Sequence, residues 1–223
     1  MSVLEALVGL VTPPDCVACG TEGSTLCTNC SDRLIKPFGE RCWRCNRLSS
    51  GSRTCASCRH AGGPGRVWIS TIYEGVAQEL IQIYKFGHVR TAAQPIAQLM
   101  HDTFGGEADY LVVPVPTATA RVRERGFGHS ELLAKTVAYQ LRMPRDQALR
   151  RLGQSRQLGS ARDDRLKQLE GKFVVKSHRA IIGKKILLVD DVLTTGGTLI
   201  AAAQALRAAG AARVDALVFA KRL

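Results

Sequence analysis

Two adjacent carboxylates stand before a loop without charge in the stretch LLVDDVLTTGGTLIAAA, which covers residues 187–203. The apolar run that comes first predicts a buried strand, with Asp190 and Asp191 at its carboxyl end. A helix is expected from Leu199. Between the acids and the helix lies a loop of hydroxyl-bearing residues and glycines, namely Thr194, Thr195, Gly196, Gly197 and Thr198.

The two ends of this stretch suit different parts of one ligand. Val192 and Leu193 are expected to turn the chain, after which glycines let backbone N–H groups come close to a ligand. The N-terminus of the following helix favours an anion such as a phosphate. Carboxylates accept hydrogen bonds from sugar hydroxyls or help to hold Mg²⁺. A phosphate with a diol nearby satisfies both ends, and ribose 5-phosphate has this form.

Other phosphate-binding loops fit the stretch less well. A P-loop requires a lysine directly after its last glycine, and a dinucleotide-binding loop requires the spacing G-x-G-x-x-G; the stretch has neither. A polar turn after a core strand, without any ligand, is the simplest alternative. The combination of acids, hydroxyls and glycines favours a sugar phosphate over these alternatives.

All eight cysteines lie within the first 58 residues, as four C-x2-C pairs. Two-residue spacing lets both sulfurs of a pair bind the same ion, and eight thiolates match two tetrahedral zinc sites that leave no open ligand position. We therefore predict two closed, structural Zn²⁺ sites. Their ligands are Cys16, Cys19, Cys27, Cys30, Cys42, Cys45, Cys55 and Cys58.

Two ways of combining these pairs stay open. The sequence CVACG, in which Gly20 permits a turn, and the helix start CTNCSDRLI favour one site from the first two pairs and a second site from the last two. A crossed arrangement, in which the first pair joins the third, is the alternative. Disulfides are disfavoured because we expect a cytoplasmic chain, whose thiols stay reduced.

The composition limits the location and the partners of the chain. Its 223 residues carry a formal net charge of +12, which favours anionic partners such as nucleic acid, phosphorylated metabolites or an anionic membrane surface. Residues 1–11 are mildly apolar but carry Glu5 and no basic segment, so they predict a short amphipathic helix and not a secretory signal. No apolar run approaches the ~20 residues of a membrane span. We expect a cytoplasmic protein without a membrane span.

Strand and helix patterns alternate from residue 67 onward. Strands are predicted over 67–73, 110–116, 172–175, 185–189 and 213–223. Helices are predicted over 74–86, 91–104, 130–141, which Ser130 would cap, and 198–210, which Gly210 would close. Several strands are apolar throughout, which is typical of a mostly parallel sheet with helices on both faces. In such sheets ligands bind at the carboxyl ends of the strands.

A glycine-rich segment, RHAGGPGRV at 59–67, separates the two parts of the chain. We place a boundary there. An N-terminal helix and a small zinc-binding module with two four-cysteine sites occupy residues 1–60, and an α/β domain occupies residues 61–223.

The stretch ILLVDDVLTTGGTL resembles, without interruption, the phosphoribosyl pyrophosphate (PRPP) signature of the type I phosphoribosyltransferases. This resemblance implies the fold of those enzymes and PRPP bound together with Mg²⁺. It also implies that Asp190 and Asp191 contact the ribose hydroxyls, and that the loop 194–198 holds the 5′-phosphate.

The layout of the whole chain is similar to that of the ComF family. The similarity rests on the N-terminal cysteine module, YKFG at 84–87, VPVP and RERGF before a helix, and the PRPP loop near the carboxyl end. ComF-like proteins are associated with DNA uptake in naturally competent bacteria and are often described as amidophosphoribosyltransferases. The resemblance implies transfer of a phosphoribosyl group to an acceptor, with loss of pyrophosphate.

Candidate cations for the diphosphate follow from the same resemblance. Arg121, Arg123 and Arg125 come after VPVP, where the family has its pyrophosphate loop. Lys85 lies inside YKFG, and Arg90 follows in the same basic stretch. Arginine suits phosphate oxygens because its planar fork donates two parallel hydrogen bonds.

The polar stretch over 150–173 resembles the mobile catalytic loop of amidophosphoribosyltransferase-like enzymes, with Gln157, Arg162 and Arg165 as candidate contacts. His129 is a candidate acid–base group, although a histidine at a helix start is more often exposed on the surface. The chain departs from the family pattern at RGFGH, where RGFNQ is usual, and at Gln168, where asparagine is expected. These departures flank the acceptor side and the loop.

Two functions from different classes remain. The first is a Mg²⁺-dependent phosphoribosyltransferase, with Asp190, Asp191, Arg162 and Arg165 at the reacting centre. The second is a non-catalytic ComF-type protein of competence and DNA uptake, which binds a nucleotide or single-stranded DNA and docks a protein of the competence machinery. Aromatic residues make up only 5% of the chain, which disfavours a large base-stacking surface. The acceptor and the oligomeric state stay open.

Overall fold

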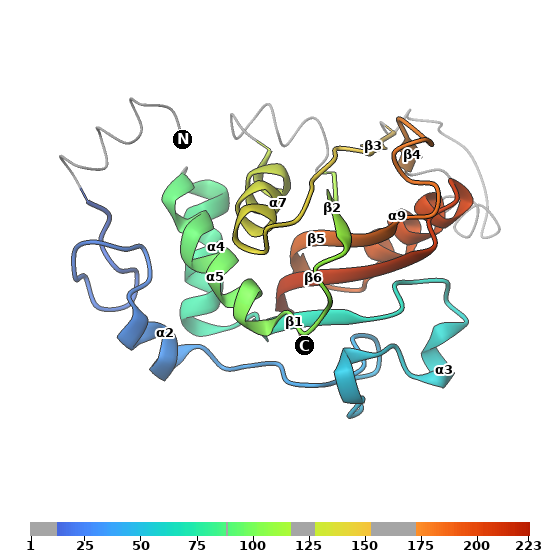
Figure 1. Cartoon of the computed structure of the whole chain (residues 1–223). Coiled ribbons are helices and arrows are strands. Elements are labelled where there is room, and N and C mark those ends of the chain that lie inside the picture. Colours follow the sequence, from blue (N-terminus) through green and yellow to red (C-terminus); the bar gives the residue numbers. More distant parts are fainter. Residues whose placement is uncertain (1–12, 88, 117–127, 153–172) are drawn as a thin grey trace, which may run out of the picture.

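The core of the chain is a four-stranded parallel sheet with the strand order β1-β6-β5-β2 (Figure 1). The computed structural model describes residues 13–87, 89–116, 128–152 and 173–223. The strands are β1 (Val67–Ile72), β2 (Tyr110–Pro114), β5 (Lys185–Leu193) and β6 (Arg213–Lys221). The predicted parallel sheet is therefore confirmed.

Helices cover both faces of this sheet. One face carries α4 (Gly75–Phe86), α5 (Ala93–Thr103), which follows the 3₁₀ turn η2 (Arg90–Ala92), and α7 (His129–Gln140). The other face carries α9 (Gly197–Ala208) (Figure 1). Among the helices of the described ranges, none has the length and apolar character needed to cross a membrane.

The side chains of β5 divide between two buried clusters. Leu187 and Val189 belong to the cluster that α4, α5 and α7 complete, and Ile186 and Leu188 belong to the cluster that α9 completes. Successive residues of a strand point to opposite faces, so a strand with helices on both sides must be apolar at every position. This explains the unbroken apolar run before the two acids.

A second, two-stranded sheet lies beside the main one. It pairs β3 (Leu149–Arg151) with β4 (Phe173–Val175) in antiparallel register. The strand predicted over 172–175 therefore exists but lies outside the parallel sheet. Leu149 and Phe173 fix this small sheet, since both are buried in the cluster that contains α9.

The structure corrects three sequence predictions around the loops. Val192 and Leu193 do not turn the chain, because β6 continues to offer partners and β5 stays paired up to Leu193 and Lys221. The helix α9 begins at Gly197 and not at Leu199. Ser130 does not cap α7, which starts at His129 with Gly128 as the N-cap; Ser130 is buried in its first turn.

The cysteine-rich segment lies along one side of the sheet and contains α2 (Thr28–Leu34), the 3₁₀ turn η1 (Ser50–Ser52) and α3 (Ala56–Arg59) (Figure 1). It packs against both buried clusters: Cys16 and Cys30 belong to one, Phe38 and Trp43 to the other. The predicted boundary at residue 60 stays a prediction, but the glycine-rich segment after it contacts α9, where Arg207 donates to the carbonyls of Gly62 and Gly63.

A buried carboxylate ties this connection to the sheet. Asp215 of β6 is fully buried, and its Oδ1 accepts the backbone N–H of Arg66 at 2.7 Å. Its Oδ2 accepts the Tyr110 hydroxyl at 2.6 Å and lies 2.6 Å from Nε of Arg213. A buried charge is tolerated only when it is paired and hydrogen-bonded, and Asp215 has three such partners.

We expect Tyr110→Phe to lower the free energy of unfolding by about 1 kcal/mol, since it removes one hydrogen bond. Asp215→Ala should cost about 2–4 kcal/mol, because it leaves a buried hydroxyl and a backbone N–H without their acceptor. Urea unfolding measures both. Glu107→Gln, which alters an exposed ion pair with Lys185, is the control and should change stability by less than about 0.5 kcal/mol. An equal loss of unfolding free energy in all three variants would contradict a stabilising role of the Asp215 hydrogen bonds.

Candidate functional site

The acidic pair lies near the carboxyl end of β5, next to the last turn of α4. Asp191 is 7% exposed, and its Oδ1 accepts a hydrogen bond from Lys85 Nζ at 2.6 Å. Lys85 reaches it because α4 packs on the face of the sheet to which Asp191 points. The structure therefore brings Lys85 to the acidic pair, although more than 100 positions separate it from these two residues in the sequence.

Asp190 has a different environment. Its Oδ1 accepts the backbone N–H of Asp191 at 3.0 Å. Burial, followed by the negative charge of Asp191, raises the pKa of Asp190 from 3.8 to about 8, while the charges of Lys85 and Arg151 oppose the rise. The ionised form of such a carboxylate is costly in the free protein, and it is stabilised when a cation binds beside it or a hydroxyl group donates a hydrogen bond to it.

The loop after β5 opens directly into the N-terminus of α9. Thr194 and Thr195 are exposed, and Gly196 has φ of +78°, a left-handed conformation that side chains other than glycine rarely adopt. Within the described residues, no side chain caps α9, and its first turn carries no acidic residue. The first N–H groups of a helix have no intrahelical acceptor, so this end of α9 can receive an anion.

A pocket of about 250 Å³ lies on the β2 side of the acids, between the end of β2, the first turn of α7 and the β3–β4 sheet. Its walls include the cationic side chains of Arg150, Arg151 and Lys176, and also Glu131. The acids do not line this pocket, but the N–H of Val115, which does, donates to the carbonyl of Val189 in the strand that carries them. Among the cations of the pocket, the charge of Arg151 acts on Asp190 and lowers its pKa.

Several predicted residues lie outside the described ranges. They are Arg121, Arg123, Arg125, Gln157, Arg162, Arg165 and Gln168. Arg90 lies in η2, where it is exposed. Their roles stay predictions.

The expectation that His129 is exposed is wrong. Its side chain is 1% exposed at the start of α7, its ring packs edge-on against Tyr84 with 5.1 Å between centroids, and its carbonyl accepts the Tyr84 hydroxyl at 2.6 Å. The reason is that the start of α7 lies against Tyr84 of α4, while the helix itself packs on α5, β5 and β2. Burial, followed by the charge of Asp191, raises the pKa of Tyr84.

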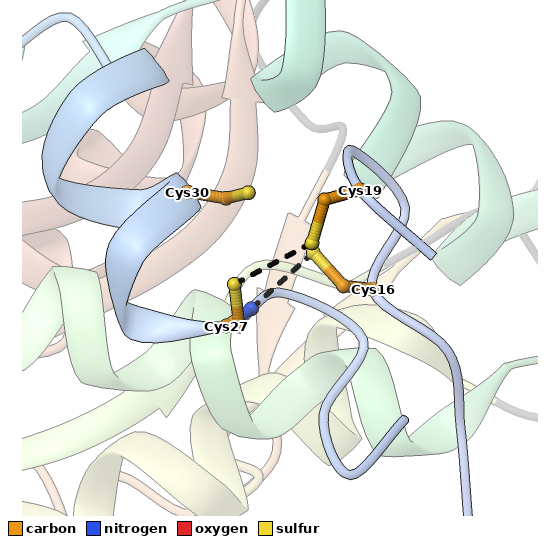
Figure 2. Close-up of side chains that lie close together, drawn as sticks. All are labelled: Cys16, Cys19, Cys27 and Cys30. Carbon is orange, nitrogen blue, oxygen red and sulfur yellow. Dashed lines mark hydrogen bonds between the residues drawn. The ribbon is translucent and has the colours of Figure 1, made fainter. Parts of the chain in front are cut away.

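The eight cysteines form two groups of four. Cys16, Cys19, Cys27 and Cys30 make up the first, whose sulfur atoms all lie within 4.8 Å of one another. Figure 2 shows these side chains, with Cys30 on α2 and Cys16 and Cys19 on the turn before it. Cys42, Cys45, Cys55 and Cys58 make up the second, with the same spacing. The sequential combination is thus confirmed, and the crossed arrangement is wrong.

Both groups fit a tetrahedral metal ion with four thiolate ligands. Cys19 Sγ lies 3.8 Å from Cys27 Sγ, and Cys45 Sγ lies 3.6 Å from Cys55 Sγ, which is close to the edge of a zinc–thiolate tetrahedron. Within the described residues no disulfide joins any of them. In each group the first and fourth cysteines are buried, so the ligands are held by the fold.

The sequence did not single out three residues that the structure places at the site. Arg151 lies at the start of the predicted catalytic loop and Lys176 lies just after its end, and this position beside short apolar runs was the available signal. Trp43 stands between two metal-ligand cysteines, in CWRC, and packs under Gly196. A large aromatic residue inside a metal knuckle was a signal that this side chain leaves the knuckle to pack elsewhere.

Comparison with known proteins agrees with this geometry. The family model "Phosphoribosyl transferase domain" matches residues 128–223, which contain the acidic pair and the loop. Together with the parallel sheet and the cysteine groups, this match defines a phosphoribosyltransferase-like protein preceded by a cysteine-rich module.

The relatives narrow this class. The "Competence protein ComFC" of Bacillus subtilis (strain 168) is 28% identical over 84% of this chain and 80% of that protein. The protein of the same name from Streptococcus pneumoniae (strain ATCC BAA-255 / R6) is 28% identical over 85% and 84%. With the two cysteine groups, these matches confirm the resemblance predicted from the sequence: the chain is similar to ComF proteins over most of its length, and its C-terminal part is similar to a phosphoribosyltransferase domain.

Among solved structures, a glutamine phosphoribosylpyrophosphate amidotransferase from B. subtilis, complexed with ADP and GMP, aligns with a TM-score of 0.43 and 16% identity. The alignment covers 62% of this chain and 30% of that one.

The raised pKa of Asp190 predicts a pH-dependent stability. The folded state binds the proton more tightly than the unfolded chain, so this residue favours folding at low pH, and the benefit is lost as the pH rises from about 4 to about 8. Asp190→Asn removes the charge. Its melting temperature should match that of the wild type near pH 4 and exceed it by a few degrees at pH 9, given about 2–4 °C for each kcal/mol.

The control for this measurement is Glu79→Gln on the exposed side of α4. It removes one carboxylate without touching the acidic pair. A gain for Asp190→Asn that does not change with pH, or equals that of Glu79→Gln, would contradict the assigned environment of Asp190.

Proposed function

We propose that the chain is a Mg²⁺-dependent phosphoribosyltransferase, which binds PRPP and transfers its phosphoribosyl group to an acceptor nucleophile. The observation that carries this proposal is the continuous path from Asp190 and Asp191, through the Gly196 turn, to the N-terminus of α9. One ribose phosphate can contact both ends of this path.

Each part of the site has a separate binding role in this proposal. The N–H groups at the start of α9 and the hydroxyls of Thr194, Thr195 and Thr198 hold the 5′-phosphate. The carboxylates of Asp190 and Asp191 accept the ribose 2′- and 3′-hydroxyls. Lys85, which bonds Asp191 at 2.6 Å in the free chain, orients that carboxylate and lowers the cost of its charge.

The reaction breaks the bond between the anomeric carbon and the diphosphate oxygen and forms a bond from that carbon to the acceptor. Positive charge develops on the ribose ring, so carboxylates beside the ring stabilise the transition state. The leaving diphosphate needs cations, and the pocket beside β2 presents Arg150, Arg151 and Lys176. When bound, Mg²⁺ neutralises diphosphate charge, and the carboxylate oxygens of the acidic pair suit this hard cation.

The two four-cysteine groups hold structural Zn²⁺ in this proposal. Four thiolates around each ion leave no position for water or substrate, so these ions stabilise the fold and do not take part in the reaction. Reduced thiolate ligands fit a reducing compartment, in keeping with the cytoplasmic location expected from the sequence.

A second candidate function follows from the names of the relatives. Two of them are competence proteins, and the net charge of +12 suits a polyanion. In this alternative the chain binds single-stranded DNA or a protein of the competence machinery, and the phosphate site serves as a ligand sensor.

The acidic pair gives the main test of the proposed function. PRPP with Mg²⁺ at about 100 times its dissociation constant should stabilise the wild-type chain by about 2.7 kcal/mol, seen as a rise in melting temperature. The double variant Asp190→Asn, Asp191→Asn should bind PRPP at least tenfold more weakly, because each hydrogen bond to a charged group contributes about 1.5–3 kcal/mol. Isothermal titration calorimetry measures both affinities.

Glu79→Gln is again the matched control and should bind PRPP as the wild type does. Release of pyrophosphate in the presence of amine or base acceptors then tests transfer. A double variant that binds PRPP as tightly as the wild type would remove the acidic pair from the site. Tight DNA binding that weakens steeply with salt, without PRPP binding, would favour the second candidate.

The metal assignment predicts two zinc ions per purified chain. Cys27→Ser and Cys55→Ser each remove one ligand from a different group, so each variant should retain about one zinc, and the double variant about none. Mass spectrometry of the native protein counts the bound ions. Fewer than one zinc in the wild type, or the loss of both ions in either single variant, would contradict two independent sites.

A further inference from the structure

Trp43 connects the second cysteine group to the loop 194–198, which leads from β5 into α9 and is called the phosphate loop below. It lies between Cys42 and Cys45 in the sequence but is only 2% exposed, in the buried cluster that contains α9. Its Nε1–H donates to Thr54 Oγ1 at 2.8 Å, and that hydroxyl donates to the carbonyl of Pro64 at 2.7 Å. The indole therefore has a fixed orientation, set by a hydrogen bond at its polar edge.

The backbone of Trp43 is held from a second direction. Lys221 Nζ donates to the Trp43 carbonyl at 2.5 Å and also to Asn46 Oδ1. Lys221 is 5% exposed at the carboxyl end of β6, where it pairs with Leu193, the last residue of β5. The residue of β6 that pairs with the end of β5 thus also bonds, through its buried ammonium group, the turn that carries two metal ligands.

The far edge of the indole lies directly under the phosphate loop. A Cβ atom at Gly196 would overlap the six-membered ring of Trp43, and a Cβ atom at Gly63 would come within 2.8 Å of the same ring. Gly196 is the N-cap of α9, and its carbonyl accepts the first helical hydrogen bond, from Ile200 at 3.0 Å. The ring therefore supports the residue from which the anion-binding end of α9 starts.

We propose that Trp43 is a positioning residue for the phosphate loop, and that metal binding at the second cysteine group is coupled through it to phosphate binding at the N-terminus of α9. The ligand part of this inference rests on the proposed function; the support of the loop by Trp43 does not.

The coupling has a direct structural cause. Cys42 and Cys45 flank Trp43, and Cys55 follows Thr54, the acceptor of its indole N–H. One ion that binds these cysteines fixes both ends of the indole contact. If the bound ion raises the affinity for a ligand that orders the loop, that ligand must raise the affinity for the ion by the same factor.

The first cysteine group provides an internal comparison. Cys16 and Cys30 pack in the cluster of α4, α5 and α7, on the opposite face of the sheet from Trp43 and α9. Cys27 and Cys55 occupy equivalent positions, since each is the third ligand of its group and the N-cap of a short helix. Disruption of the first group should leave the loop unchanged.

Hydrogen exchange of the full-length, zinc-bound chain without ligand tests this support. Amides of residues 194–200 should exchange about tenfold faster or more in Trp43→Ala and in Cys55→Ser, and at the wild-type rate in Cys27→Ser. Trp68→Ala, which removes a buried tryptophan from the other cluster, controls for a general loss of stability. Trp43→Phe keeps a ring under Gly196 and should restore most of the protection.

Equal exchange of the loop in Cys55→Ser and Cys27→Ser, or in Trp43→Ala and Trp68→Ala, would overturn the inference. If Trp43→Ala does not fold, the comparison of the two cysteine variants decides alone.

The ligand arm uses the wild-type chain and a zinc chelator. Ribose 5-phosphate at saturation should slow the release of one zinc ion several-fold and leave the other unchanged. Binding of ribose 5-phosphate without any effect on either ion would contradict the coupling. If ribose 5-phosphate and PRPP do not bind at all, the proposed function fails, while the exchange experiment still decides whether Trp43 supports the loop.

Discussion

The pairing of β5 with β6 is the constraint on which the rest of the structure depends. It continues past the acidic pair to Leu193 and Lys221, beyond the point at which the sequence suggested a turn. Because of this extension, the acids are held inside the sheet with fixed directions, and the loop starts from a rigid strand end. The same extension places Lys221 where it can bond the turn that carries Cys42 and Cys45. Two parts of the chain that look independent in the sequence are thus joined at one strand end.

The acidic pair is a costly feature of this arrangement. Two adjacent carboxylates at the end of a buried strand repel each other, and burial makes the charge of Asp190 still less favourable. Lys85 relieves part of this cost by its contact with Asp191. The remainder is left in the free protein, which is typical of binding sites whose ligand supplies the missing partners. The burial and the close approach of the two carboxylates thus make the ionisation of Asp190 costly in the free protein, and under the proposed function the ligand offsets this cost.

The sequence predicted the elements and the local motifs well, because these depend on neighbours in the chain. The apolar run before Asp190 needed only strand periodicity, and the C-x2-C pairs needed only ligand spacing. What it missed depends on contacts between distant segments. The burial of His129 comes from its contact with Tyr84 of α4, and the length of β5 comes from β6. No local pattern contains this information, since it arises only when the sheet is assembled.

The cysteine module also follows this rule. Read alone, CWRC is a metal knuckle with an aromatic residue of no evident use, and TTGG is a loop that requires glycine for an unstated reason. The structure explains both motifs by one contact, because the indole of Trp43 fills the space that a side chain at Gly196 would need. The glycine is thus required for the left-handed turn and for the tryptophan beneath it. Under the proposed function, a loop whose shape is set from below by a separate cysteine-rich segment is preorganised for phosphate before any ligand arrives.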